Sequence, residues 1–160
     1  MDVRRRYLWF VGGWTLLVAL LMLLVPTALR ARLPEPITVE WTFSGAPEDS
    51  SPLRDFLFEE LVWWLVVAAV WSVLGFGGVL KRRGLAWASA ALGAFGATML
   101  GTVVLTTVAN LDAPSFRDAI DPPSSGWLLL GGALAGWLGW RLGSRSEGTP
   151  PTDRDVSAVR

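Results

Sequence analysis

The sequence predicts an all-α membrane protein with four transmembrane helices and one short extracytoplasmic β-strand loop. The chain of 160 residues is 52% hydrophobic and only 18% charged, whereas about a quarter of an ordinary soluble domain is charged. Its apolar residues gather in four long stretches, and most of its basic residues flank these stretches on one side. Length, hydropathy and charge distribution therefore agree on a multi-pass protein.

The four apolar stretches define the expected helices. Those at about 7–25, 56–80 and 85–109 reach the roughly 20 residues that a helix needs to cross a bilayer. The fourth, at about 126–142, is shorter and needs local thinning of the bilayer or snorkelling of its flanking residues to span it. Residues 1–142 then form one transmembrane domain with an outer loop at 26–55. The polar tail 143–160 is expected to be disordered.

Charge sets the expected orientation. Basic residues cluster before the first stretch, between the second and third, and after the fourth, whereas acidic residues gather in the other two loops. By the positive-inside rule, both termini of a protein of the bacterial cytoplasmic membrane would face the cytoplasm. A cleaved signal peptide is the alternative for the N-terminus, but the first apolar run is longer than a signal peptide requires.

Few side chains are available for catalysis. The chain has no Cys and no His, which removes thiol chemistry and the commonest general base and metal ligand. We therefore expect no enzyme, no cofactor and no metal site, and the balanced net charge gives no indication of nucleic-acid binding.

Three carboxylates lie at the expected start of the second helix, for which Ser51 is the expected N-cap. Asp55 and Glu59 share a helix face, with Glu60 beside them, so they repel unless a cation lies between them. A divalent cation with oxygen ligands is one candidate. The favoured interpretation is neutralisation by arginines of the same loop, namely Arg30, Arg32 or Arg54.

Small residues predict close packing of the third and fourth helices. In a membrane, small residues at four-residue spacing allow two helix backbones to approach closely. One such ridge lies on each helix, and the two would form an antiparallel pair. The ridges are Gly93, Ala97 and Gly101 on the third helix, and Gly131, Ala135 and Gly139 on the fourth.

A polar line runs beside the first ridge at the same spacing: Thr98, Thr102, Thr106 and Asn110. These residues either line a hydrated path or bond to carbonyls one turn earlier and to a neighbouring helix. We favour the second interpretation, because no ionisable residue interrupts the middle of any expected span.

The loop between the first two helices contains the expected strand. Ile37, Val39, Trp41 and Phe43 alternate with polar residues, which is typical of a strand with one apolar face. The second outer loop, at about 110–125, offers no strand to pair with it. The apolar face is therefore expected to lie on the helix tops or the lipid interface, or else the strand edge pairs with another chain.

The same loop resembles the N-terminal membrane domain of Sdp-type toxin-immunity proteins, as found in actinobacterial membrane proteins. The resemblance covers Leu33-Pro34, a short strand ending in an aromatic residue, and Gly45-Ala46-Pro47-Glu48. Glu40 stands where the family pattern has His, and Thr38 where it usually has Pro. The loop positions implied as partner-binding are Pro34, Glu40, Trp41, Gly45, Pro47 and Glu48.

This resemblance implies toxin immunity or envelope signalling, by sequestering or sensing a peptide or protein on the extracytoplasmic side. From the residues alone, a small transporter or channel subunit is the main alternative, and an accessory subunit of a larger membrane complex is another. The expected partners are the lipid bilayer, an extracytoplasmic peptide or protein, and a second copy of the chain in a homo-oligomer.

Overall fold

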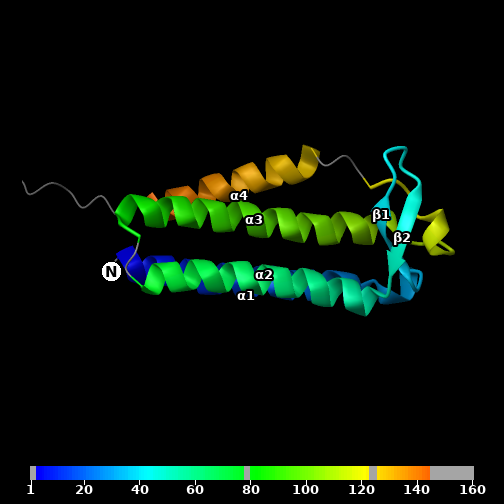
Figure 1. Cartoon of the computed structure of the whole chain (residues 1–160), viewed down its shortest axis with the longest axis horizontal. Coiled ribbons are helices and arrows are strands. Elements are labelled where there is room, and N and C mark those ends of the chain that lie inside the picture. Colours follow the sequence, from blue (N-terminus) through cyan, green and yellow to red (C-terminus); the bar gives the residue numbers. More distant parts are fainter. Residues whose placement is uncertain (1–2, 78–79, 123–125, 145–160) are drawn as a thin grey trace, which may run out of the picture.

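The computed structural model describes residues 3–77, 80–122 and 126–144, which form a bundle of four helices with a β-hairpin across one end (Figure 1). The helices are α1 (Val3–Ala28), α2 (Leu53–Phe76), α3 (Arg82–Ala109) and α4 (Gly126–Ser144). The strands are β1 (Ile37–Trp41) and β2 (Pro47–Ser51), and two 3₁₀ turns, η1 (Arg30–Arg32) and η2 (Phe116–Asp118), lie in the loops.

Three of the helices are long and apolar enough to cross a membrane, as the sequence predicts. The qualifying segments are Arg5–Ala28, Leu53–Phe76 and Arg83–Ala109. The segment expected as the fourth span also forms a helix, but α4 has 19 residues, is rich in glycine and contains Arg141. It does not reach the same apolarity, so three helices qualify as candidate membrane spans and a fourth span is not confirmed. Beyond Ser144, the expected disordered tail lies outside the described residues.

The most extensive helix contact in the bundle joins α3 to α4, and α1 packs against both α3 and α2 (Figure 1). The α1, α2 and α3 helices meet around Trp64, Val18 and Leu92, which are fully buried. Two indole N–H groups form hydrogen bonds between these helices. Trp64 Nε1 of α2 donates to Thr15 O of α1 at 3.1 Å, and Trp14 Nε1 of α1 donates to Leu92 O of α3 at 3.2 Å. These bonds satisfy polar groups that lipid could not.

The packing of α3 against α4 depends on backbone proximity. A Cβ on Gly93 would lie 2.6 Å from Ala135 O, and one on Gly139 would lie 2.4 Å from Ser89 O. Side chains at these positions would push the backbones apart. Gly101 meets Leu128, whereas Gly131 has open space around it. The glycines buried on α4 are Gly132, Gly136 and Gly139.

The hairpin corrects the prediction of a single unpaired strand. Residues Pro47–Ser51 form β2, which pairs antiparallel with β1. The register shifts twice between Thr38 and Trp41, so the expected alternation breaks down: Thr38 is completely buried and Phe43, in the turn, is fully exposed. The pairing partner was missed because Pro-Glu-Asp-Ser-Ser carries no apolar alternation.

The start of α2 also differs from the prediction. Ser51 is the last residue of β2 rather than an N-cap, and the helix begins at Leu53 after Pro52. The N–H of Leu53 is instead bonded by a carboxylate from outside the helix, Glu35 Oε1, at 3.1 Å. This contact satisfies one of the free donors of the helix start and ties the segment before β1 to α2.

Candidate ligand-binding site

The hairpin is fixed to the end of α3 by a buried amide. Asn110, which is completely buried, accepts a bond from Thr38 N and donates to Thr38 O, both at 2.8 Å, and also donates to Thr106 O at 2.9 Å. The hydroxyl of Thr38 donates to the carbonyl of Phe116. A side-chain amide thus satisfies the backbone of the strand in the way a neighbouring strand would.

The second outer loop is held against η1 by an ion pair. Arg32 donates to the carboxylate of Asp112, with Nε at 2.9 Å from Oδ1, and Asp112 N donates to Arg32 O at 2.8 Å. Asp112 has φ 59°, a conformation that Asp tolerates better than most residues. The bond from Arg32 lowers the pKa of the Asp112 carboxyl below its ordinary value of 3.8, although both side chains are largely exposed.

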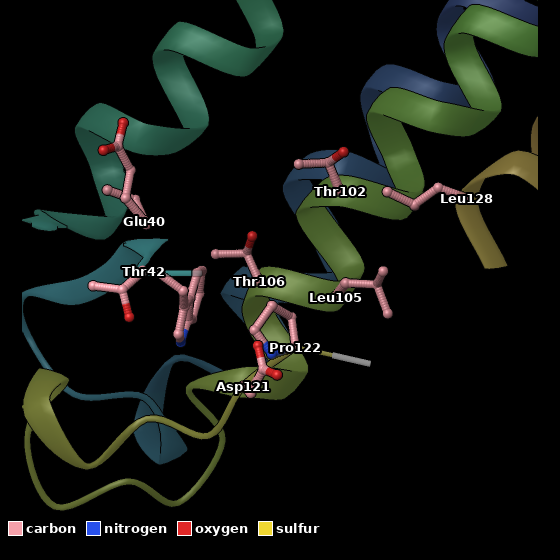
Figure 2. Close-up of a pocket in the computed structure, with 10 residues that line it drawn as sticks. Glu40, Thr42, Thr102, Leu105, Thr106, Asp121, Pro122 and Leu128 are labelled. Atoms are coloured by element: carbon pink, nitrogen blue, oxygen red, sulfur yellow. The ribbon is translucent and has the colours of Figure 1, made fainter. Parts of the chain in front are cut away.

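A pocket of about 590 Å³ opens between the hairpin, α3 and the second outer loop (Figure 2). Thr102, Leu105 and Thr106 come from α3, and Asp121 and Pro122 come from the loop before α4. The remaining lining residues are Val39, Glu40, Trp41 and Thr42 of the hairpin and Leu128 of α4.

The hairpin turn is shaped to fit this loop. Gly45 has φ 81°, and a Cβ there would lie 2.9 Å from Cγ of Asp121. Only glycine combines this backbone conformation with so close an approach. The turn is closed by Thr42, whose N–H donates to Ala46 O at 2.8 Å and whose hydroxyl accepts a bond from Ala46 N at 3.0 Å.

The pocket has an acidic rim, and a buried indole N–H without an acceptor belongs to one of its lining residues. Trp41 Nε1 is one of two buried side-chain polar atoms that lack a hydrogen-bond partner among the described residues. A buried donor without an acceptor costs about 1–3 kcal/mol. Glu40 lies opposite Asp49 in the hairpin register, and Asp121 lies on the other wall. Neighbouring carboxylates of this kind favour a positively charged ligand.

The structure brings together only part of the predicted loop motif. Glu40 and Trp41 line the pocket, and Gly45 contacts its wall through Asp121. Pro47 pairs with Trp41 across the hairpin, and Glu48 is exposed on β2. Pro34 lies before β1 and outside the pocket.

The polar line on α3 forms hydrogen bonds along its own helix, and two of its residues also line the pocket. Thr98 and Thr102 donate to carbonyls one turn earlier, at 3.0 and 3.2 Å, as the favoured interpretation predicts. Thr102 and Thr106 nevertheless line the pocket. Asp121 and Pro122 were missed as site residues, since nothing in their local sequence indicates that the loop folds back against Gly45.

The acidic start of α2 does not have the arginine partners expected for it. Throughout residues 3–77, 80–122 and 126–144, the one ion pair is Arg32 with Asp112, so Arg30 and Arg54 do not neutralise Asp55 or Glu59. Nor does this part of the chain contain a group of three or more side chains able to hold a metal ion.

Comparison with known proteins gives no match to any family model, curated protein or solved structure. The class of the protein therefore follows from its own architecture. It is a helical bundle with three helices able to span a membrane and a hairpin-capped pocket at one end. The likeness of its loop to the Sdp-type immunity domain stays a prediction based on the loop residues alone.

Proposed function

We propose that this chain is a non-enzymatic integral protein of the bacterial cytoplasmic membrane that binds a cationic peptide in its hairpin pocket, for toxin immunity or envelope signalling. The main support is that the loop motif and the α3 polar line meet in one pocket. Glu40 and Trp41 of the loop motif line the same pocket as Thr102 and Thr106 of the α3 polar line. Two features that are separate in the sequence thus form one site.

The chemistry of the pocket supports a cationic, hydrogen-bonding ligand. Glu40 and Asp121 supply negative charge on two walls, Trp41 supplies an aromatic side chain, and Thr102 and Thr106 supply polar side chains. A peptide offers matching groups, because its backbone carbonyls accept hydrogen bonds and its basic side chains pair with carboxylates or stack on an indole.

The proposed topology has four spans, with the hairpin outside and both termini in the cytoplasm. With 19 residues, α4 is about 28 Å long, close to the roughly 30 Å of the hydrocarbon core. It also packs along α3, which is apolar enough to span by itself. The basic residues near the helix ends opposite the hairpin favour a cytoplasmic position for those ends.

The orientation can be tested with one introduced thiol, because the chain has no Cys. Phe43, fully exposed at the hairpin tip, is replaced in a Phe43→Cys variant. A maleimide that cannot cross membranes should label this variant in intact spheroplasts. Labelling that occurs only after the membrane is permeabilised would place the hairpin inside and contradict the proposal.

Binding is tested with a fluorescent lysine-rich amphipathic peptide and a matched peptide that has Gln in place of Lys. The protein is held in nanodiscs, and growth protection against the lysine-rich peptide is measured in parallel. Glu40→Gln, Trp41→Ala and Asp121→Asn should each weaken binding of the cationic peptide and reduce protection.

The matched control is Glu48→Gln, which removes the same charge from the hairpin outside the pocket. Equal losses in this control and in Glu40→Gln would show that only the net charge matters. Unchanged binding and protection in Trp41→Ala and Asp121→Asn would disprove peptide binding in the pocket.

Transport is a second candidate function, because Thr102 and Thr106 of the polar line open onto the pocket from the last turns of α3. A path through the membrane would need several copies of the chain to enclose it. Liposome flux that Thr102→Val reduces would favour transport, and absence of flux would exclude it. Co-purification in mild detergent would detect a homo-oligomer or a larger membrane complex.

A further inference from the structure

A second, apolar groove of about 350 Å³ lies between the end of α1 and the start of α2. Leu23 of α1 and Leu57, Phe58 and Leu61 of α2 form its apolar part. Phe58 is 69% exposed, so this groove opens on the outside of the bundle. In a helix with the apolarity needed to span a membrane, such a surface faces lipid.

Two arginines border this groove at the end of the bundle that carries the hairpin. Arg30 lies in η1, just past the end of α1, and Arg54 lies in the first turn of α2. Arg54, Phe58 and Leu61 are spaced four and three residues apart, so they share one face of α2. A single helix face therefore presents a cation at the level of the membrane surface and apolar side chains below it.

Neither guanidinium has a carboxylate partner within the described part of the chain, where the single ion pair joins Arg32 to Asp112. Asp55 directly follows Arg54 in the chain but forms no ion pair with it. Glu35, the carboxylate nearest to Arg30 in sequence, bonds to the N–H of Leu53. Both arginine side chains are exposed, and their charges are available to an external anion.

We propose that this groove binds an anionic phospholipid of the hairpin-side leaflet. The phosphate bridges Arg30 and Arg54, and one acyl chain lies along Leu23, Leu57, Phe58 and Leu61. The charge of the two guanidinium groups selects the headgroup, and Arg in particular suits phosphate because it donates two parallel hydrogen bonds. This site is separate from the hairpin pocket, and its existence does not depend on peptide binding.

The test is lipid retention, measured by native mass spectrometry of the detergent-purified full chain. Phosphatidylglycerol and phosphatidylcholine with identical acyl chains are added in equal amounts. The wild type should retain phosphatidylglycerol preferentially. A double variant, Arg30→Gln with Arg54→Gln, should bind it roughly thirtyfold more weakly, as expected for the loss of two basic residues near a membrane surface.

The matched control is Arg117→Gln, which removes an exposed cation at the same end of the bundle, where Arg117 lies over the Phe116 ring instead of an apolar groove. It should retain phosphatidylglycerol like the wild type. Phe58→Ala shortens the groove and should weaken binding of long-chain more than short-chain phosphatidylglycerol. Circular dichroism checks that each variant is folded.

Three results would overturn the inference. The first is equal retention of the two lipids by the wild type, and the second is undiminished retention by the folded double variant. The third is complete competition by inorganic phosphate, which would show a simple anion site instead of a lipid site. Peptide binding at the hairpin pocket should be unchanged in the double variant, so failure here is distinguishable from failure of the proposed function.

Discussion

The α3 helix is held in two different ways. It packs against α4 along its length, and it is bonded to the hairpin at its end. Along α4, contact depends on the absence of side chains, with glycines placed against backbone carbonyls. At the hairpin, contact depends on one polar side chain, Asn110, which bonds to both backbone groups of Thr38. Inside a bilayer, close packing is the main attraction between helices. At the exposed end, hydrogen bonds to the backbone can specify a fixed arrangement.

The α3–α4 interface should be the more sensitive of the two to added volume. In Gly139→Leu, the Cβ would lie 2.4 Å from Ser89 O, and this backbone atom cannot move without displacing the helix. We expect a loss of about 3 kcal/mol or more, at the upper end of overpacking effects, measured by SDS unfolding followed by circular dichroism.

Gly131→Ala is the control for this change, because nothing lies within 4 Å of the position its Cβ would take. It should unfold like the wild type, or slightly later because alanine favours helix. Equal destabilisation by the two variants would show that α4 does not pack on α3 through Gly139.

The hairpin junction should be sensitive to loss of a single amide. Asn110→Ala leaves Thr38 N and Thr38 O without partners in a buried position. The expected cost is about 2–3 kcal/mol, and it should be local to the hairpin. Hydrogen exchange should show faster exchange at Thr38 N with little change in the middle of α3. Uniform loss of protection along the whole helix would contradict the division between the two regions.

The turn of the hairpin should respond to backbone strain. Gly45→Ala places a Cβ at φ 81° and 2.9 Å from Asp121, which should cost about 1–2 kcal/mol. In the double variant Gly45→Ala with Asp121→Gly, the steric part of this cost should be relieved, because Cβ and Cγ of Asp121 are both removed. If thermal unfolding shows the same loss of stability in the single and the double variant, backbone strain in the turn accounts for the whole loss. Contact with Asp121 would then contribute nothing.

The smallest expected effect concerns the exposed ion pair of Arg32 and Asp112. The bond from Arg32 lowers the pKa of Asp112 in the folded protein below 3.8. The carboxylate therefore contributes to stability above pH 3.8, and this contribution is lost as the pH falls through the lower pKa of the folded state. Asp112→Asn keeps a residue that tolerates φ 59° but should abolish this acid-dependent change. If the wild type and Asp112→Asn lose stability in the same way as the pH falls, the Asp112 carboxylate does not contribute to the acid dependence, and the prediction is wrong.

The sequence predicts one side of this comparison better than the other. Hydropathy predicts α1, α2 and α3, and spacing predicts the approach of Gly93 and Gly139 to the partner helix, because both signals are local and periodic. The same reasoning selected Gly131, which faces open space, since spacing alone does not specify which of two adjacent glycine rows faces the partner.

The hairpin end depends on contacts between residues distant in the chain. Asn110 was recognised as part of a polar line, but its partner Thr38 lies 72 residues away. The strand β2 has no apolar alternation, and Asp121 reaches the pocket only because the second outer loop folds back to Gly45. No local sequence pattern indicates these long-range contacts, so the pocket could not be predicted from sequence.

The bond between Asn110 and Thr38 has a mechanical consequence. It joins the hairpin to Asn110, the residue that directly follows α3. Neither Asn110 nor Thr38 is exposed to water. Because the amide holds both the donor and the acceptor of one strand residue, the hairpin cannot pivot about a single bond. This two-point attachment restricts rotation of the hairpin relative to the third helix.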